Sequence, residues 1–430
     1  MNGSTLLIYT AVEQVRLSYI VSTLLGEQVF ITQSKEQFIA FNGYKISYAA
    51  KRIGNEELHI APHGLLQQIG IQDQQVDCFK WEGFPVFFKT NGDIPFDFFS
   101  AAFYLITRYE EYLPSAKDAY GRYSHENSIA YQQNFLHQPI IQYWRSKIFS
   151  PSTFPSLPFS FSPSYDIDIA YSYRSHSILR NTLGYFRDLL KGNSISITER
   201  MRVLFESQQD PYDVYEWLAL LHSSLQLKPI YFFLLASKRN KLDKNISPRS
   251  TALQILIKKI VKQNRVGIHP STQSTKDEWV LKNEIDNLQS IVKQPVQLSR
   301  QHYIFLEHPN TYQRLIEAGI THDYSMGYPS INGFRASYAA AFTWFNLQTN
   351  QSSALTIHPF CYMDATAIFQ EKISPANALQ QMQYYFDTVK SVGGEFIPVM
   401  HNNLLTTQPG FIAWRNIYAD FLLKNCTKLV

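Results

Sequence analysis

The sequence has few cysteines and no apolar run long enough to cross a lipid bilayer. Cys78, Cys361 and Cys426 lie far apart in a chain of 430 residues, and no CxxC pair is present. Such spacing provides no disulfide framework and fits a reducing compartment. The first 20 residues lack the basic segment of a signal peptide and are interrupted by Glu13 and Arg16. We therefore expect a cytoplasmic protein without a membrane span.

The sequence also lacks a strong charge of either sign and several common catalytic signatures. The net charge is +4, and the basic residues are scattered, so nucleic-acid binding is not expected. No GxGxxG, GxxxxGK[ST], GxSxG or HExxH pattern occurs. These absences argue against dinucleotide binding, P-loop chemistry, serine hydrolases and zincin proteases.

Aromatic residues, in contrast, are abundant. They make up 15% of the chain, with 27 Tyr and 30 Phe, and hydrophobic residues make up 45%. A surplus of this kind is typical of a Phe-rich core with Tyr at its rim, and it is also found where a cleft stacks against sugar rings. The composition is that of a folded globular protein.

A stretch rich in proline and serine at residues 150–164 divides the chain. Proline disfavours regular structure on both sides, so this stretch predicts a domain boundary. We predict a smaller N-terminal α/β domain at residues 1–155, which begins with strands at 4–9, 29–32 and 45–48. Residues 94–113 predict one long helix, with Asp97 as its cap.

The second part, residues 156–430, alternates between strand and helix patterns. Buried strands are predicted at 159–165, 229–236, 266–269, 296–298, 354–357 and 395–400. Amphipathic helices lie between most of them, and a helical insertion is expected at about 170–225. This alternation is typical of parallel β/α units, in which functional sites gather at the carboxyl ends of the strands.

Polar residues follow these strands at the expected positions. Asp166 and Asp168 end the first strand, and one residue separates them. Two carboxylates on the same side of a strand repel each other unless a cation lies between them. The residues that follow the later strands are His269, Arg300, His302, Asp323 and His401.

In the order of these motifs, residues 159–405 resemble the polysaccharide deacetylases of the chitooligosaccharide deacetylase (NodB-like) type. SYDID, residues 164–168, is similar to the first motif of that family. The resemblance implies that Asp166 is the general base and Asp168 a metal ligand. GIHPS, residues 267–271, is similar to the second motif and implies that His269 is a metal ligand.

The later motifs complete the resemblance. SRQHY, residues 299–303, stands where the family has an arginine that keeps the catalytic aspartate ionised, which implies this role for Arg300. HDYSMGY, residues 322–328, resembles the fourth motif and implies a catalytic role for Asp323. VMHN, residues 399–402, resembles the last motif, whose histidine is the general acid, and here that is His401. The implied fold is a distorted (β/α) barrel, preceded by the smaller α/β domain.

The chain departs from the family at one metal ligand. The second motif of the family has another histidine four residues after the first, and Gln273 stands there. His302 replaces a residue that is usually proline in the third motif, so it is the candidate for the missing ligand. The alternative is a protein that has lost its metal and its activity.

The resemblance implies a metal-dependent hydrolase that removes N-acetyl groups from a glycan or glycan precursor, with zinc or a similar divalent metal. Two alternatives stay open: an inactive glycan-binding or scaffolding protein, and hydrolysis of an amide that is not a sugar. Segments 108–113, 118–124 and 333–342 resemble a divergent branch with its own N-terminal domain. That domain could dock a partner, cap the cleft or close over the substrate.

Several other polar residues are given ordinary roles. Arg335 is expected to pair with a helix carboxylate, and Arg108 and its neighbours to lie on a solvated or ion-paired face. His358 is expected to be structural. Asp243 and Asp364 follow strand-like segments and are assigned no role.

Overall fold

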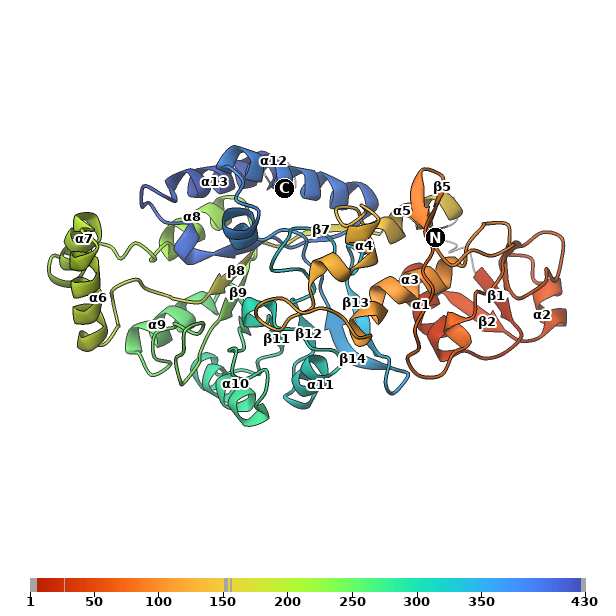
Figure 1. Ribbon diagram of the computed structural model, residues 1–430, viewed down its shortest axis with the longest axis horizontal. Coiled ribbons are helices and arrows are strands. Elements are labelled where there is room, and N and C mark those ends of the chain that lie inside the picture. The colour runs from red at the N-terminus through yellow and green to blue at the C-terminus, as the bar shows by residue number, and fades with distance from the viewer. Residues whose placement is uncertain (1–5, 27, 151–153, 155–156, 427–430) are drawn as a thin grey trace.

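The computed structural model describes residues 6–26, 28–150, 154 and 157–426. A small sheet lies at one end of the molecule, and a larger sheet surrounded by helices forms the rest (Figure 1). The α/β class and the separate N-terminal α/β sheet that the sequence predicted are confirmed. The exact boundary at residues 155 and 156 lies outside the described residues and stays a prediction.

The N-terminal sheet has four parallel strands in the order β2-β1-β3-β4. Its strands are β1 (Leu6–Thr10), β2 (Val29–Thr32), β3 (Tyr44–Tyr48) and β4 (Leu58–Ile60). All five residues of β1 are buried, as their near-continuous apolar character requires in a central parallel strand. Two helices connect the strands, α1 (Val15–Leu25) and α2 (Lys35–Ala40).

The helix predicted at residues 94–113 is shorter than expected. Helix α3 (Phe98–Ile106) begins at the Asp97 cap, whose carboxylate accepts the N–H of Ser100 at 3.0 Å, and every residue in it is buried. Arg108 then adopts a left-handed conformation with φ 55°, and a short 3₁₀ turn, η2 (Tyr109–Tyr112), follows. A left-handed residue ends the α-helix, so the prediction of one continuous helix was wrong.

The large sheet has eight strands in the order β13-β14-β12-β11-β10-β9-β8-β16. All neighbours are parallel except β13 and β14. Its strands are β8 (Ser164–Ile167), β9 (Ile230–Phe233), β10 (Arg265–Ile268), β11 (Leu298–Ser299), β12 (His322–Asp323), β13 (Phe342–Asn346), β14 (Gln351–Ile357) and β16 (Val399–His401). Within the described ranges β13 and β16 do not pair with each other, so the barrel is not closed by hydrogen bonds.

Helices flank this sheet on two sides (Figure 1). The helices α12 (Pro375–Val392) and α13 (Ile412–Cys426) lie along one side, near α8 (Tyr215–Ser224). The other side carries α9 (Thr251–Ile260), α10 (Glu278–Val292) and α11 (Asn310–Glu317). A two-stranded sheet of β7 (Phe159–Phe161) and β15 (Gly394–Phe396) adds to the fold.

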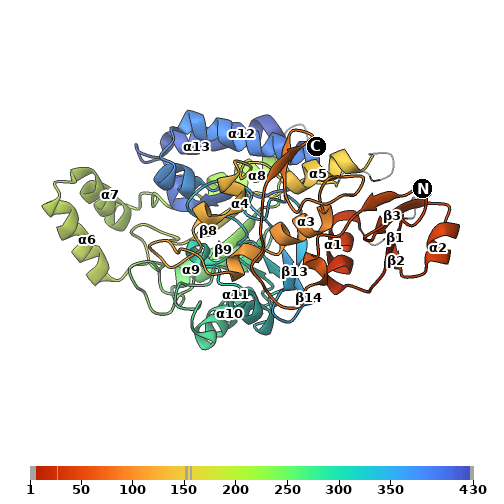
Figure 2. The same ribbon diagram turned by 45° about the vertical axis from the view of Figure 1, so that its right-hand side comes forward.

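The helical insertion predicted at about 170–225 is not one continuous stretch. Helices α6 (Ile178–Leu190) and α7 (Ser194–Phe205) form a hairpin that projects from the body in both views (Figures 1 and 2), whereas α8 returns to the core. Asp210 anchors the base of the hairpin, because its carboxylate accepts the backbone N–H groups of Ser172, Tyr173 and Arg174 at 2.7–3.0 Å. We name this pair of helices the α6–α7 hairpin.

The two sheets belong to parts that share one hydrophobic core. A buried ion-pair network also joins them, in which Glu111 accepts from Arg335 at 2.6 Å and from Arg108 at 2.7 Å. The expected pairing of Arg335 with a carboxylate is thus present, although Arg108 and Glu111 are buried and not solvated. No helix in the described part of the chain is long and apolar enough to cross a membrane.

Candidate active site

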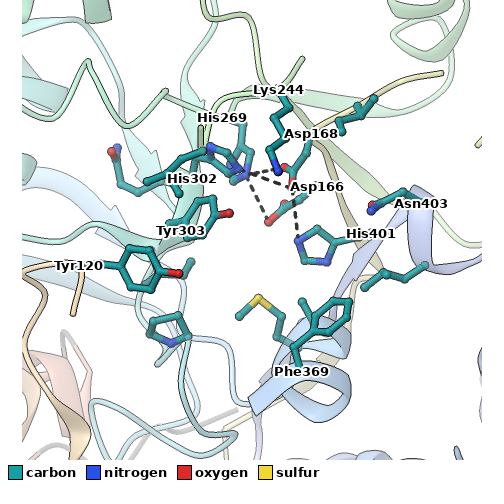
Figure 3. Close-up of a pocket in the computed structure, with 18 of the residues that line it drawn as sticks. Tyr120, Asp166, Asp168, Lys244, His269, His302, Tyr303, Phe369, His401 and Asn403 are labelled. Carbon is teal, nitrogen blue, oxygen red and sulfur yellow. Dashed lines mark ion pairs between the residues drawn. The ribbon is translucent and has the colours of Figure 1, made fainter. Parts of the chain in front are cut away.

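The parallel strands bring the predicted polar residues to one edge of the sheet. His401 at the end of β16 lies beside Asp166 in β8, and Asp166 is in register with Phe232 of β9. His269 follows β10 directly, and Arg300 follows β11. These ends open into a pocket of about 420 Å³ (Figure 3). Five of the predicted residues line it: Asp166, Asp168, His269, His302 and His401.

Three side chains in this pocket could hold a metal ion. The ligand atoms of Asp168, His269 and His302 all lie within 4.8 Å of one another. The Asp168 carboxylate is 3.2 Å from Nε2 of His269 and 3.6 Å from Nε2 of His302. Figure 3 shows both rings turned toward this carboxylate. A carboxylate and two imidazoles are a common donor set for zinc and similar divalent metals.

The other ring nitrogen of each histidine is held by the protein. Nδ1 of His269 donates to the backbone carbonyl of Arg300 at 2.5 Å, and Nδ1 of His302 donates to the Asp243 carboxylate at 2.9 Å. Asp243 also accepts the N–H and the hydroxyl of Thr272, at 3.0 and 2.6 Å. Bonds of this kind fix the tautomer that leaves Nε2 free, as metal-binding histidines require.

The Asp168 carboxylate itself fits a cation. Its Oδ1 atom is buried and has no hydrogen-bond partner, which is costly for a carboxylate without a compensating charge. Burial alone would raise the pKa of Asp168, but the positive charge of His302 and the proximity of the His269 ring hold it well below its usual range. Burial likewise lowers the pKa of His302, and Asp168 and Asp243 outweigh this and raise it to about 9.

Gln273, at the position of the family's second histidine, does not line the pocket. Its side-chain amide donates to the backbone carbonyl of Lys238 at 2.6 Å. His302 comes from the loop after β11 and fills the place near Asp168. The third candidate ligand is therefore supplied by a different strand.

Asp166 is held by Arg300. Nη1 of Arg300 donates to the Asp166 carboxylate at 2.9 Å, and both side chains are almost fully buried. Nε of Arg300 donates to the carbonyl of Tyr324 at 3.0 Å, and the guanidinium lies 4.5 Å from the ring centre of Phe232. Arg300 does not line the pocket, and its contact with the residues that do includes the bond to Asp166.

His401 faces Asp168 and Asp166 from the other side of the pocket. Its Nδ1 donates to Asp364 at 2.6 Å, its backbone N–H donates to the same carboxylate at 2.7 Å, and its Nε2 is 4.0 Å from Asp168. Burial would lower the pKa of His401, but Asp364 and the two pocket aspartates raise it to about 10. A proton on Nε2 is therefore available to a group in the pocket at neutral pH.

A catalytic role was predicted for Asp323, but its side chain does not reach the pocket. It is fully buried and does not line the pocket. Its two oxygens accept the N–H and the hydroxyl of Ser325, both at 2.9 Å, and Ser325 accepts the N–H of Gln301 at 2.9 Å. Burial raises the pKa of Asp323 to about 6. This placement favours support of the loop that carries Arg300 and His302 over contact with a substrate.

Two carboxylates that sequence reasoning left without a role hold pocket histidines: Asp243 and Asp364. Each follows a strand of the large sheet, as the catalytic candidates do, and this position was the available signal. Their partners are 59 and 37 residues away in sequence. No local pattern therefore linked each carboxylate to its histidine.

The N-terminal region contributes a wall of the pocket. Tyr120 lines it together with Tyr303 and Phe369 (Figure 3), and Arg122 also lines it. Arg122 donates to the carbonyl of Tyr303 at 2.6 Å and bonds the Asp118 carboxylate at 2.7 Å. The ring centres of Tyr120 and Tyr303 are 5.7 Å apart. Aromatic side chains therefore form part of the wall of the pocket.

Comparison with known proteins gives a distinct result for each part of the chain. Residues 6–151 match the family described as "Family of unknown function (DUF7033)". No match was found among curated proteins. The family match covers about a third of the chain and says nothing about the pocket that lies mostly beyond it.

Solved structures similar to this chain are polysaccharide deacetylases and their relatives. A protein described as a polysaccharide deacetylase from Mycobacterium smegmatis is 13% identical, with a TM-score of 0.41, over 64% of this chain and 86% of that one. A polysaccharide deacetylase from Bacillus cereus is 10% identical, with a TM-score of 0.31, over 63% and 88%. A CE4 family pseudoenzyme from Bacillus anthracis is 10% identical, with a TM-score of 0.29, over 62% and 61%. The resemblance expected from the motifs is confirmed, and at these identities and TM-scores it says nothing about activity.

Proposed function

We propose that this protein is a metal-dependent hydrolase that removes N-acetyl groups from a glycan or glycan precursor. The observation that carries the proposal is that a candidate base, Asp166, and a candidate acid, His401, both lie beside the three candidate metal ligands. Asp166 is a carboxylate held by Arg300, and His401 is an imidazole held by Asp364. A base and an acid on two sides of a metal group serve hydrolysis, whereas simple binding of a sugar requires neither.

In this proposal Asp168, His269 and His302 hold the metal, and zinc suits their donor atoms. When bound there, the metal supplies a Lewis acid that polarises the acyl carbonyl and lowers the pKa of water. Asp166 takes the proton of the attacking water, and Arg300 keeps the carboxylate oriented toward the pocket. His401 then gives its Nε2 proton to the departing amine, which is a poor leaving group while it is neutral.

The walls of the pocket support a sugar substrate. Tyr120 and Tyr303 line it with aromatic rings 5.7 Å apart, and aromatic rings stack well against the apolar faces of sugar rings. A cytoplasmic location, which fits the three widely spaced cysteines, belongs to the same proposal. It favours a small or lipid-linked precursor over a finished cell-wall polymer.

The test is release of acetate from N-acetylated oligosaccharides by the full chain loaded with zinc. We expect Asp166→Asn and His401→Asn each to lower kcat by roughly 100-fold or more, since general acid–base catalysis contributes about 10²–10⁴. Both variants should retain zinc, because neither residue is among the three candidate ligands. Asp286→Asn, an equal change at an exposed carboxylate on α10, is the matched control.

Three outcomes separate the alternatives. Acetate release that depends on Asp166 and His401 supports the proposal. Binding of N-acetylated oligosaccharides without release of acetate would support the inactive glycan-binding alternative. Full activity in either variant would contradict the assigned acid and base.

A further inference from the structure

We name the pocket that contains Asp168, His269 and His302 the metal pocket. A second hollow adjoins it. It has a volume of about 740 Å³ and lies between the α6–α7 hairpin and the body of the protein. Ile169 and Lys244 line both this hollow and the metal pocket. The two hollows are therefore adjacent, and a ligand of sufficient length could occupy both. We name the second hollow the basic groove.

The basic groove is rich in positive charge. Five cationic side chains line it: Arg180, Arg187, Arg200, Arg239 and Lys244. Asp188 is the one carboxylate among the described residues that line it, and it pairs with Arg187 at 2.8 Å and Arg200 at 2.7 Å. A single negative charge cannot neutralise five positive ones, so the groove keeps a surplus that an anion would relieve.

Several donors in the groove have no anionic partner. Arg180 donates to the backbone carbonyl of Lys244 at 3.1 Å, and no carboxylate lies within ion-pair distance of Arg180, Arg239 or Lys244 in the described ranges. Burial lowers the pKa of Arg180, and the nearby Arg239, Arg187 and Arg200 lower it further. Nε of Arg200 and Nδ1 of His176 are buried without hydrogen-bond partners.

An apolar surface begins where the basic groove ends. A hollow of about 540 Å³ on the α6–α7 hairpin is lined mainly by Tyr185, Phe186, Met201, Leu204 and Phe205. It shares His176, Asn181 and Arg200 with the basic groove. The metal pocket, the basic groove and the apolar hollow therefore follow one another in space.

The apolar character extends over the projecting hairpin. Ile178, Leu190 and Phe205 are 87%, 89% and 74% exposed. Ile178 and Phe205 both line the apolar hollow, and exposed apolar side chains that gather in this way indicate a surface that meets another apolar group. The metal pocket, the basic groove and the apolar hollow, in this spatial order, would fit the sugar, the phosphate and the apolar carrier of one molecule.

We propose that the basic groove is a subsite for a phosphate or diphosphate group on the substrate, whose N-acylated sugar occupies the metal pocket. This inference rests on the proposed function for the identity of the sugar, but the anion site itself does not. Guanidinium groups bind phosphate oxygens in pairs of charge-assisted hydrogen bonds. The substrate class is accordingly a sugar phosphate ester, on either a soluble or a lipid carrier.

The first test uses inorganic pyrophosphate and the full chain freed of metal with a chelator, so that a bound metal cannot take up the anion. Isothermal titration calorimetry should show binding to the wild type. The double variant Arg180→Gln/Arg239→Gln should bind at least about tenfold more weakly, because two charge-assisted hydrogen-bonding groups are lost. Arg202→Gln, an equal change on α7 outside the groove, should change the affinity less than about twofold.

Two results would overturn the proposal. One is that the wild type does not bind pyrophosphate, and the other is that the wild type and the double variant bind it equally well. If the double variant does not fold, the single variant Arg239→Glu at an exposed position should give the same loss. Because the protein is free of metal and nothing is hydrolysed, the result is independent of the proposed deacetylase activity.

The second test identifies the carrier. N-acetylglucosamine 1-phosphate should bind more tightly than N-acetylglucosamine by at least about tenfold, and equal affinities would contradict the phosphate subsite. Vesicles of phosphatidylglycerol, compared with phosphatidylcholine, test a lipid source. Sedimentation with the anionic vesicles that is reduced in Phe205→Gln supports a lipid-linked substrate. Binding of the sugar phosphate without sedimentation supports a soluble one.

Discussion

Two carboxylates behind the pocket, Asp243 and Asp364, hold the side chains that face it. They accept from Nδ1 of His302 and His401, at 2.9 and 2.6 Å. Arg300 holds Asp166 in the same way at 2.9 Å. The pocket therefore consists of pairs, in which one partner faces the cavity and the other sets its tautomer or its charge.

The pairing of His401 with Asp364 gives a prediction for the pH dependence of activity. A general acid must carry its proton, and Asp364 contributes to a pKa of His401 of about 10. In Asp364→Asn the negative charge is lost, so the pKa of His401 falls. The alkaline limb of the pH–kcat profile should then move to lower pH, and kcat above neutral pH should fall by roughly tenfold or more.

The matched control for this measurement is Asp387→Asn, at an exposed carboxylate on α12. It should leave the alkaline limb where it is in the wild type. An unchanged limb in Asp364→Asn, with a merely lower kcat, would show that His401 is not the acid whose ionisation limits the reaction.

At the scale of residues, the sequence could reveal the side chains that face the pocket but not those behind it. Asp166, Asp168, His269 and His401 stand in short motifs at strand ends, so their proximity follows from the parallel sheet. Asp364 lies 37 residues before His401 and carries no motif of its own. Asp323 stands in a motif yet lies behind the pocket, because the loop after β12 directs its oxygens to Ser325.

At the scale of elements, helix α10 holds the loop that follows His269 in place. Its residue Glu284 is buried, and the carboxylate accepts the N–H of Ser271 at 2.9 Å, two residues after His269. The other carboxylate oxygen has no partner. Burial raises the pKa of Glu284 to about 7, and the charge of Asp243 adds to this effect. The helix thus holds the loop of His269 through a carboxyl group that keeps its proton below neutral pH.

This raised pKa predicts a pH-dependent stability difference. The stabilising effect of the protonated carboxyl is fully present below the unfolded pKa of 4.5 and is lost as the pH rises through about 7. Glu284→Gln keeps an uncharged acceptor for Ser271 and removes the cost of burying a charge. Through this group the wild type should lose about 3 kcal/mol of unfolding free energy between pH 4 and pH 8, and Glu284→Gln should not. The stability of the variant relative to wild type should therefore be higher at pH 8 than at pH 4 by about that amount.

Urea denaturation at the two pH values measures this difference. Glu278→Gln makes the same substitution at an exposed position in the first turn of α10 and should show a much smaller pH dependence. A difference between Glu284→Gln and wild type that is equal at both pH values would contradict the raised pKa.

At the scale of elements, periodicity found the strands and helices of the large sheet but not the breaks between them. The long apolar pattern at residues 94–113 contains no glycine or proline after the cap that would reveal the interruption at Arg108. The interruption depends on buried ion pairs with Glu110 and with Glu111 of η2. The more distant Arg335 completes the network, and no local pattern predicts such a partner.

At the scale of the whole molecule, the buried ion-pair network around Glu111 joins the N-terminal region to the large α/β part. Glu111 accepts from Arg335 and Arg108, and Arg108 also donates to the hydroxyl of Tyr328 at 2.9 Å. These residues lie in both the N-terminal region and the large α/β part, and each is almost fully buried. Burial would raise the pKa of Glu111, but Arg335 and Arg108 hold it well below its usual range. The two parts are therefore expected to unfold together.

Removal of the shared carboxylate tests this coupling. Glu111→Gln leaves two buried guanidinium groups without their common counter-ion, which should cost roughly 3–5 kcal/mol of unfolding free energy. Tyr328→Phe, in the same network, removes one hydroxyl and should cost about 1 kcal/mol. Urea denaturation followed by tryptophan fluorescence measures both, and a smaller loss in Glu111→Gln than in Tyr328→Phe would contradict the role given to the network.

The central claim is that His302 takes the place of the missing second-motif histidine as a metal ligand. The direct measurement is the metal content of the purified full chain after incubation with zinc and removal of excess ions. We expect stoichiometric zinc in the wild type and in Gln273→Ala, whose side chain bonds Lys238 outside the pocket. We expect its loss in Asp168→Ala, His269→Ala and His302→Ala. Stoichiometric zinc in His302→Ala, or no zinc, cobalt or nickel in the wild type, would contradict the claim.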